Sequence, residues 1–175
     1  MFSYNQITTR RRFLSFLVIT PWMLSCQRKI SLDPKPIRWD KDVCARCGMQ
    51  ISDHFHSAQI INPDTGDALY FDDLGCAFLW LDENHVPWKD RAIIYLTDGQ
   101  EGQWIKHTDA FFATPYVTSM AFGIAAFSQP EKISQDKTRL TQNEVLEHLI
   151  RHRDEKRRMN APLNDTMNST HKNTP

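Results

Sequence analysis

The chain of 175 residues is 41% hydrophobic, which is enough for one ordinary core and one domain. Its formal net charge is zero, and loss of residues 1–25, which include three arginines and no acidic residue, would leave roughly −3. Proteins that bind nucleic acids concentrate positive charge on one face, and the folded region shows no such accumulation along the sequence. We therefore expect no nucleic-acid partner.

The N-terminal segment has the composition of an export signal. Three arginines at positions 10–12 precede Phe13-Leu14 and an apolar stretch through Leu24, which is similar to a twin-arginine signal. The stretch is shorter than the ~20 residues of a spanning helix and contains Pro21. We predict a removable signal peptide over residues 1–25.

Cys26 is the predicted attachment point of a lipid. It follows Met-Leu-Ser in an arrangement similar to a bacterial lipoprotein cleavage site. A lipid on Cys26 would anchor the protein to a membrane, facing the periplasm. The alternative is ordinary cleavage, by the twin-arginine or general secretory route, leaving a soluble periplasmic protein. Residues 26–42 are polar and contain Pro34 and Pro36, so they predict a tether.

Residues 44–49 read Cys-Ala-Arg-Cys-Gly-Met and bring two thiols and a thioether close together. These soft ligands favour copper(I) over harder divalent ions. If Cys26 carries lipid, three cysteines remain, an odd number that leaves at least one thiol outside any disulfide. Reduced cysteines at C-x-x-C spacing in an exported protein indicate metal capture.

The segment after this motif predicts a hairpin and a helix. Residues 57–62 and 67–71 are strand-like and flank a Pro-Asp-Thr-Gly turn. Residues 73–83 follow with apolar side chains at helical spacing, and Asp72 and Asp73 are placed to cap the helix rather than to bind copper(I).

The pattern of the second half predicts a repeat of this plan. Residues 91–97 and 103–106 predict a hairpin around Asp98-Gly99. Residues 110–114 predict a short helix or strand, and residues 122–127 predict a buried strand.

The C-terminal part predicts one helix and a disordered tail. Residues 141–144 match the capping-box pattern and precede an apolar face, which predicts a helix over 141–152. Residues 153–175 are charged and then rich in Asn, Thr and Pro, a composition typical of disorder.

Several separate motifs resemble the NosL family, in the same order along the chain. They are C-x-x-C-G-M at 44–49, Ala-Gln-Ile at 58–60, Phe-Asp-Asp-Leu-Gly-Cys at 71–76, Trp-Ile at 104–105 and Ser-Met-Ala-Phe-Gly-Ile-Ala-Ala-Phe at 119–127. The family usually has Pro-Met-Gly-Tyr-Gly where this chain has Ser-Met-Ala-Phe-Gly, so Met120 is kept. Motifs in register are more specific than one C-x-x-C alone.

The resemblance implies both a fold and a function. The NosL family comprises lipid-anchored copper-binding accessory proteins of nitrous oxide reductase. We therefore expect an α+β fold of two similar ββα-type units in one compact domain over residues 43–152. The expected role is non-enzymatic delivery of copper(I) to apo nitrous oxide reductase or another extracytoplasmic copper enzyme. A membrane maturation complex is a further expected partner.

The predicted copper ligands fall into two ranks. The first rank is Cys44, Cys47, Met49 and Met120, and the second is His54, His56 and Cys76. Plainer interpretations remain for each kind of residue: a disulfide or half of a zinc site for the C-x-x-C pair, core packing for the methionines and Cys76, and solvation for the histidines.

Two other functions also use a C-x-x-C motif. A thiol-disulfide oxidoreductase normally places the first cysteine at a helix N-terminus after a strand, whereas a strand follows the motif here. A structural zinc module needs a second pair of ligands, and His54 and His56 are closer together than the usual spacing.

Overall fold

Two hairpins form the larger of two sheets in the computed structural model, which describes residues 30–160. Strands β1 (Ala58–Ile61) and β2 (Ala68–Phe71) make the first hairpin, and β3 (Ile93–Thr97) and β4 (Trp104–Lys106) make the second. Strand β1 also pairs antiparallel with β3, which gives the order β2-β1-β3-β4. Both predicted hairpins are confirmed, with slightly shorter strands.

A smaller sheet follows, made of β5 (Phe111–Thr114), β6 (Ala125–Phe127) and β7 (Thr138–Leu140) in the order β6-β5-β7. Residues 110–114, predicted as a helix or a strand, thus contribute a strand. The predicted strand 122–127 begins only at Ala125, because the positive φ angles of Ala121 (59°) and Gly123 (73°) bend the preceding segment into a loop.

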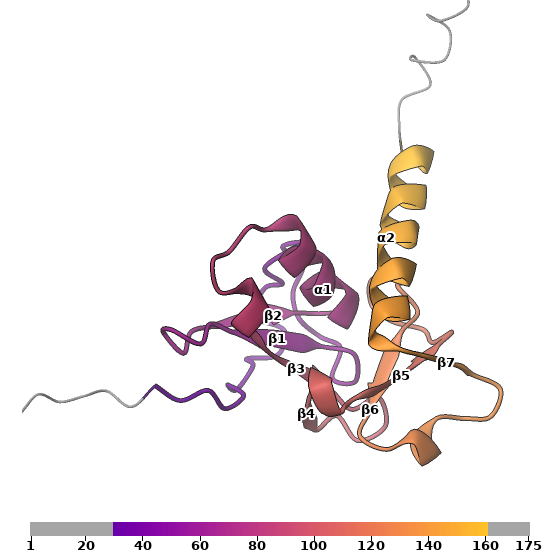
Figure 1. The fold of residues 1–175 in the computed structure, drawn as a ribbon, viewed down its shortest axis with the longest axis horizontal. Coiled ribbons are helices and arrows are strands. Elements are labelled where there is room, and N and C mark those ends of the chain that lie inside the picture. The colour runs from indigo at the N-terminus through magenta and orange to yellow at the C-terminus, as the bar shows by residue number, and fades with distance from the viewer. Residues whose placement is uncertain (1–29, 161–175) are drawn as a thin grey trace, which may run out of the picture.

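Helix α1 (Leu74–Glu83) begins where the sequence predicts. The Asp73 side chain accepts a hydrogen bond of 2.7 Å from the backbone N–H of Gly75, which caps the first turn. The helix contacts β1 and β2 on one side and the C-terminal helix on the other. Figure 1 shows this arrangement, with α1 over the larger sheet and α2 rising beside it.

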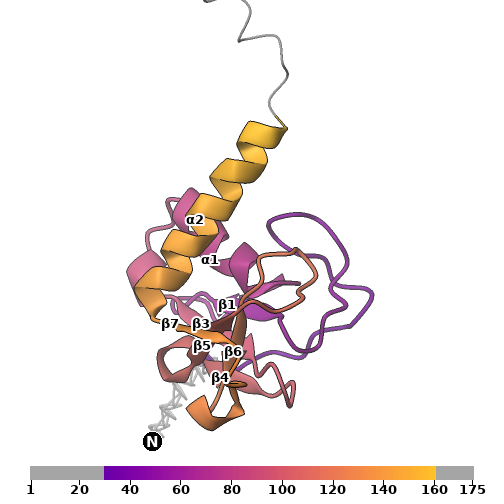
Figure 2. The same ribbon diagram turned by 90° about the vertical axis from the view of Figure 1, so that its right-hand side faces the viewer.

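The C-terminal helix, α2 (Gln142–Met159), has the predicted capping box between Thr141 and Glu144. It continues seven residues beyond the predicted end at residue 152, so the prediction of disorder from residue 153 onward is wrong for residues 153–159. The added turns are held to α1, because Arg153 forms ion pairs with Asp82 and Glu83. In the side view of Figure 2, α2 lies across α1 and extends past it. Residues 161–175 lie outside the described part.

The predicted tether is shorter than residues 26–42, because residues 32–39 pack on the domain. The backbone N–H of Lys35 donates to the buried side chain of Gln59 (2.8 Å), and the Gln59 amide donates to the Lys35 carbonyl (3.2 Å). Ile37 is buried and Trp39 packs against the core. The predicted signal peptide and Cys26 lie outside the described residues.

The fold class is α+β, as predicted. Three short 3₁₀ helices complete it, at Lys89–Arg91, His107–Asp109 and Pro130–Lys132. The main core joins the larger sheet to both helices, and its fully buried side chains include Ile60, Phe71, Leu74, Leu79 and Leu149. Among residues 30–160, no helix combines the length and the apolar character needed to cross a bilayer.

Candidate metal centre

Cys44 and Cys47 lie on a tight loop that precedes β1. The backbone N–H of Cys44 donates to the carbonyl of Met49 (2.8 Å), and the N–H of Gly48 donates to the carbonyl of Cys44 (2.9 Å). Gly48 has a φ of 73°, the left-handed conformation that glycine adopts without strain, so the loop turns back on itself there. The N–H of Ala45 donates to the carbonyl of Tyr70 and fixes the loop to the end of β2.

The third sulfur comes from α1. Cys76 is in the first turn of the helix, two residues after Leu74, and is fully buried. Asp73 caps this turn, while the carboxylate of the neighbouring Asp72 accepts the backbone N–H groups of Ser52 (2.7 Å) and Asp53 (3.0 Å). The predicted capping role is therefore confirmed for Asp73, whereas the side chain of Asp72 binds the segment after the motif loop instead of the helix.

The sulfur atoms of Cys44, Cys47 and Cys76 all lie within 4.8 Å of one another, and none is disulfide-bonded to a cysteine of residues 30–160. We call these three residues the thiol cluster. Cys44 and Cys76 are buried, and Cys47 is partly exposed. The cluster is therefore a pocket of soft ligands with one side nearer to solvent.

The three thiols of the cluster differ in pKa. The pKa of Cys44 is lowered to about 5, first because the Cys76 thiol donates to it, and further because backbone N–H groups, including that of Cys47, point at its sulfur. The pKa of Cys76 is raised by the same hydrogen bond and by burial. Burial is the largest cause of the raised pKa of Cys47. At neutral pH the cluster therefore holds one thiolate and two thiols.

Arg46 lies between the two cysteines of the motif and binds the far end of α1. Its Nε and Nη2 atoms donate to the two carboxylate oxygens of Glu83 at 2.9 and 3.0 Å. Glu83 is the main cause of the raised pKa of Arg46, and the nearby Cys76 sulfur adds to it. The guanidinium group thus places a positive charge beside the thiol cluster, where it offsets the negative charge of a thiolate.

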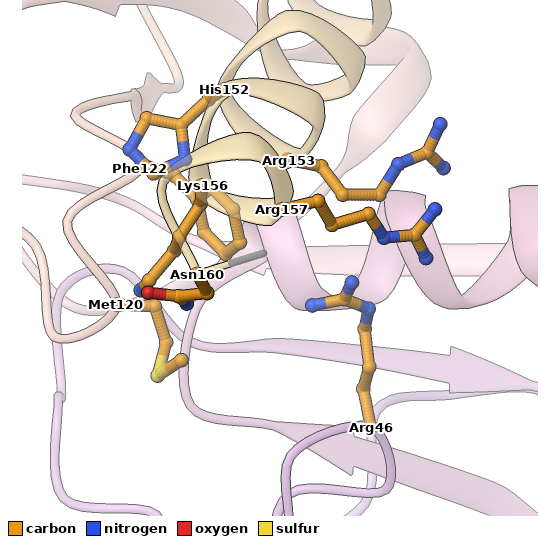
Figure 3. Close-up of a pocket in the computed structure, with 8 residues that line it drawn as sticks. All are labelled: Arg46, Met120, Phe122, His152, Arg153, Lys156, Arg157 and Asn160. Atoms are coloured by element: carbon orange, nitrogen blue, oxygen red, sulfur yellow. The ribbon is translucent and has the colours of Figure 1, made fainter. Parts of the chain in front are cut away.

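The two predicted methionine ligands have different surroundings. The side chain of Met49 is half exposed at 52%. Met120 packs against the core, and its backbone N–H donates to the Asp73 carboxylate (3.3 Å), which attaches its loop to the start of α1. Its side chain lines a cavity that Arg46 also lines (Figure 3). Both ligand roles stay predictions.

Neither predicted histidine belongs to the thiol cluster. The ring of His54 stacks on Trp39, with centroids 3.9 Å apart. The Nδ1 atom of His56 is 2.8 Å from a carboxylate oxygen of Asp53. His54 thus has its partner in the N-terminal segment and His56 in its own loop.

Cys76 is more prominent in the structure than its second rank in the sequence analysis indicates. Its neighbours Phe78 and Leu79 gave it the pattern of a core residue, and it is indeed buried. The signal that could have identified it is its position in the first turn of a helix with an acidic cap, in a chain with an odd number of remaining cysteines.

The donor set fits a soft, monovalent ion. Three sulfurs can surround copper(I), and the burial of Cys44 and Cys76 would limit the access of water and oxidants on their side of the ion. Binding through all three sulfurs requires Cys47 and Cys76 to lose their protons, so metal uptake would release protons. The core around the cluster is formed by apolar packing.

A comparison with family models gives one match. The NosL model matches residues 36–132, more than half of the chain and a range that contains the whole thiol cluster. No curated protein matches the chain.

Proposed function

We propose, because this chain belongs to the NosL family, that it captures copper(I) in the thiol cluster and delivers it to a copper enzyme outside the cytoplasm. The family is one of copper-binding accessory proteins and not a known family of enzymes, and it indicates an extracytoplasmic protein. The proposed client is apo nitrous oxide reductase, with delivery serving its copper–sulfide cluster.

The observation that carries this proposal is the convergence of three unpaired thiols from two distant segments of the chain. A chaperone must hold copper(I) tightly enough to exclude oxidants and still release it to the client. Cys44 supplies a thiolate at neutral pH, and the partial exposure of Cys47 gives client ligands a side from which to approach. Met120 is the proposed thioether ligand, and Met49 a second candidate.

The chemistry of the cluster favours copper over the two alternatives. A structural zinc site takes four ligands, and the cluster among residues 30–160 supplies three. A redox-active C-x-x-C pair needs an accessible thiolate, whereas the low-pKa Cys44 is only 2% exposed. We therefore propose copper delivery in preference to thiol-disulfide exchange and to a structural zinc site.

Anaerobic titration of the reduced protein with copper(I) and with zinc(II) tests the proposal. We expect one copper(I) per chain, bound more tightly than zinc. The Cys44→Ser, Cys47→Ser double variant should lose copper(I) while keeping its circular dichroism spectrum. Undiminished copper binding by this variant, or a preference for zinc, would contradict the assignment.

The role of Met120 needs its own comparison. Met120→Leu should weaken copper(I) binding, while Met159→Leu, which changes an exposed methionine at the end of α2, should not. Equal affinities of the two variants would remove Met120 from the ligand set without affecting the role of the cysteines.

The location and the partners form the rest of the proposal. We propose export by the N-terminal signal and attachment to a membrane through lipid on Cys26, where a membrane maturation complex would also be available. Metabolic labelling with a fatty acid should mark the wild-type chain and not Cys26→Ser.

A further inference from the structure

A cavity of about 350 Å³ lies between the motif loop and the C-terminal half of α2 (Figure 3). Its lining is strongly basic, and we call it the basic cavity. The lining residues are Arg46, Met120, Phe122, His152, Arg153, Lys156, Arg157 and Asn160. In Figure 3, the side chains of Arg153 and Arg157 extend side by side from α2, and the guanidinium group of Arg157 lies nearer to that of Arg46.

The positive charge of the basic cavity is only partly neutralised. Glu83 is shared by three arginines, at 2.9 Å from Arg46, 3.6 Å from Arg153 and 3.8 Å from Arg157. Lys156 forms no ion pair with a carboxylate of residues 30–160. None of the acidic residues that pair with these cations lines the cavity itself. Arg153 also pairs with Asp82 (3.2 Å) and Asp154 (3.0 Å), so four cations face three carboxylates, and an anion entering the cavity would still meet more positive than negative charge.

One buried polar atom of the lining also lacks a partner. The Nδ1 atom of His152 is buried and makes no hydrogen bond, while its ring packs edge-on against Phe122, with centroids 5.2 Å apart. Buried polar groups without a partner are rare in folded proteins. Because this atom is buried, an anion in the cavity would be bound by the arginine and lysine side chains and not by His152 Nδ1.

The basic cavity adjoins the thiol cluster. Arg46 belongs to the motif loop itself, one residue before Cys47, and Met120 is held to the cap of the helix that carries Cys76. A molecule in this cavity would therefore lie beside the proposed copper site, in contact with the loop that supplies two of its sulfurs.

We propose that the basic cavity binds a carboxylate-rich segment of the protein with which copper is exchanged. This inference rests on the proposed function and adds a docking site to it. Arginine binds carboxylates through paired hydrogen bonds, which gives an acidic segment both affinity and orientation. Docking there would bring the partner's copper ligands to the partly exposed side of the thiol cluster.

The shape of the site favours a protein segment over a membrane surface. The side chains of Arg46 and Arg153 are only 20% and 16% exposed, so a flat bilayer would reach them poorly. An extended segment can enter the cavity and place side chains on alternate sides along its length. The carboxylates of this segment would compete with Glu83 for Arg46. Because Arg46 belongs to the motif loop, docking would act directly on that loop.

The test uses a fluorescent peptide of alternating Glu and Ala, with a matched peptide of Gln and Ala, and measures anisotropy with the reduced, copper-loaded protein. We expect binding of the Glu peptide only, weakening as salt is raised. Lys156→Glu with Arg157→Glu should weaken binding at least about tenfold, a loss of about 1.4 kcal/mol. Arg151→Glu with Arg158→Glu makes the same charge change on α2 outside the cavity lining and should change binding less than about twofold.

Equal loss in the two double variants would overturn the proposal, because it would indicate general charge attraction. Equally tight binding of inorganic phosphate, or of vesicles of anionic phospholipid, would also overturn it. Copper(I) affinity is measured in parallel and should be unchanged in both variants. Failure of the docking proposal thus appears in the peptide binding while copper(I) binding stays normal, whereas failure of the proposed function appears as loss of copper selectivity in the unaltered protein.

Discussion

At the scale of single residues, the three thiols of the cluster differ in pKa, so they do not lose their protons at the same pH. Cys44 keeps a thiolate because its sulfur receives hydrogen bonds from Cys76 and from backbone N–H groups of the motif loop. Cys76 keeps its proton because that proton is the one shared with Cys44. The buried pair therefore carries one negative charge even before a metal binds, and this charge favours the binding of a cation.

The pH dependence of this charge can be predicted. The pKa of Cys44 lies below its ordinary value of 9.0, at about 5, so the thiolate should persist at neutral pH and be lost as pH falls through about 5. The ultraviolet absorbance of the thiolate, followed in an acid titration of the reduced, metal-free protein, measures this. Cys44→Ser should lack the transition, and a wild-type transition near pH 9 instead would contradict the prediction.

A second prediction concerns the rank of Cys76. Substitutions beside a metal's direct ligands typically cost about 10–100-fold in affinity, so we expect Cys76→Ser, which removes a ligand, to weaken copper(I) binding by about 100-fold or more. Competition with a chromophoric copper(I) chelator measures this. Ala77→Ser places a hydroxyl at an equally buried neighbouring position and should leave the affinity nearly unchanged. Equal effects of the two substitutions would indicate that Cys76 is a core residue and not a copper ligand.

At the scale of elements, α1 is the part to which the site is attached. Its first turn carries Cys76, its cap residue Asp73 binds the backbone of Met120, and its last residue Glu83 binds Arg46. Gly75 makes this assembly close-packed. A Cβ atom there would lie 2.6 Å from Phe122 Cγ and 2.8 Å from Leu149 Cδ2, so only glycine fits between α1, the Met120 loop and α2.

We therefore expect Gly75→Ala to destabilise the protein although alanine is the better helix former. Overpacking costs about 1–3 kcal/mol, which exceeds the gain of at most about 1 kcal/mol from helix propensity. Urea unfolding measures the change. The cost should shrink in a Phe122→Leu background, because the smaller side chain relieves the contact. Strictly additive effects of the two substitutions would show that the Gly75–Phe122 contact is not the cause.

The element scale also shows where sequence patterns suffice. The hairpins and the start of α1 follow from turn residues and a cap, which are local signals. The last turns of α2 were not predictable in this way, because Arg153 and Arg157 look like residues of a solvated tail until Asp82 and Glu83 are placed opposite them. Two further features likewise depend on tertiary contacts and not on local patterns. One is the position of Cys76 next to the motif loop, and the other is the basic cavity.

At the scale of the whole molecule, the segment before the motif is part of the domain. Gln59 lies in the buried strand β1 with no exposed surface, and both of its side-chain polar groups bond to the backbone of Lys35. The Tyr95 hydroxyl donates to the carbonyl of Leu32 at 3.2 Å. These contacts fasten residues 32–35 across the larger sheet.

Gln59→Ala should therefore loosen the N-terminal segment and lower overall stability. Leaving the Lys35 backbone groups without their partners costs about 1–3 kcal/mol. Thermal unfolding measures the stability, and limited proteolysis should cut residues 32–39 faster in the variant. Gln100→Ala, at an exposed turn, is the matched control and should behave like the wild type. Unchanged proteolysis of Gln59→Ala would mean that other contacts hold the segment.

The attachment at Leu32 sets how far the domain can travel if Cys26 carries the proposed lipid. The two positions are six apart along the chain, and even a fully stretched chain of that length covers only about 20 Å. Such a short linker would keep the thiol cluster close to the bilayer surface. Copper would then be transferred between proteins that lie side by side at the membrane surface, and not between proteins that diffuse freely in the periplasm.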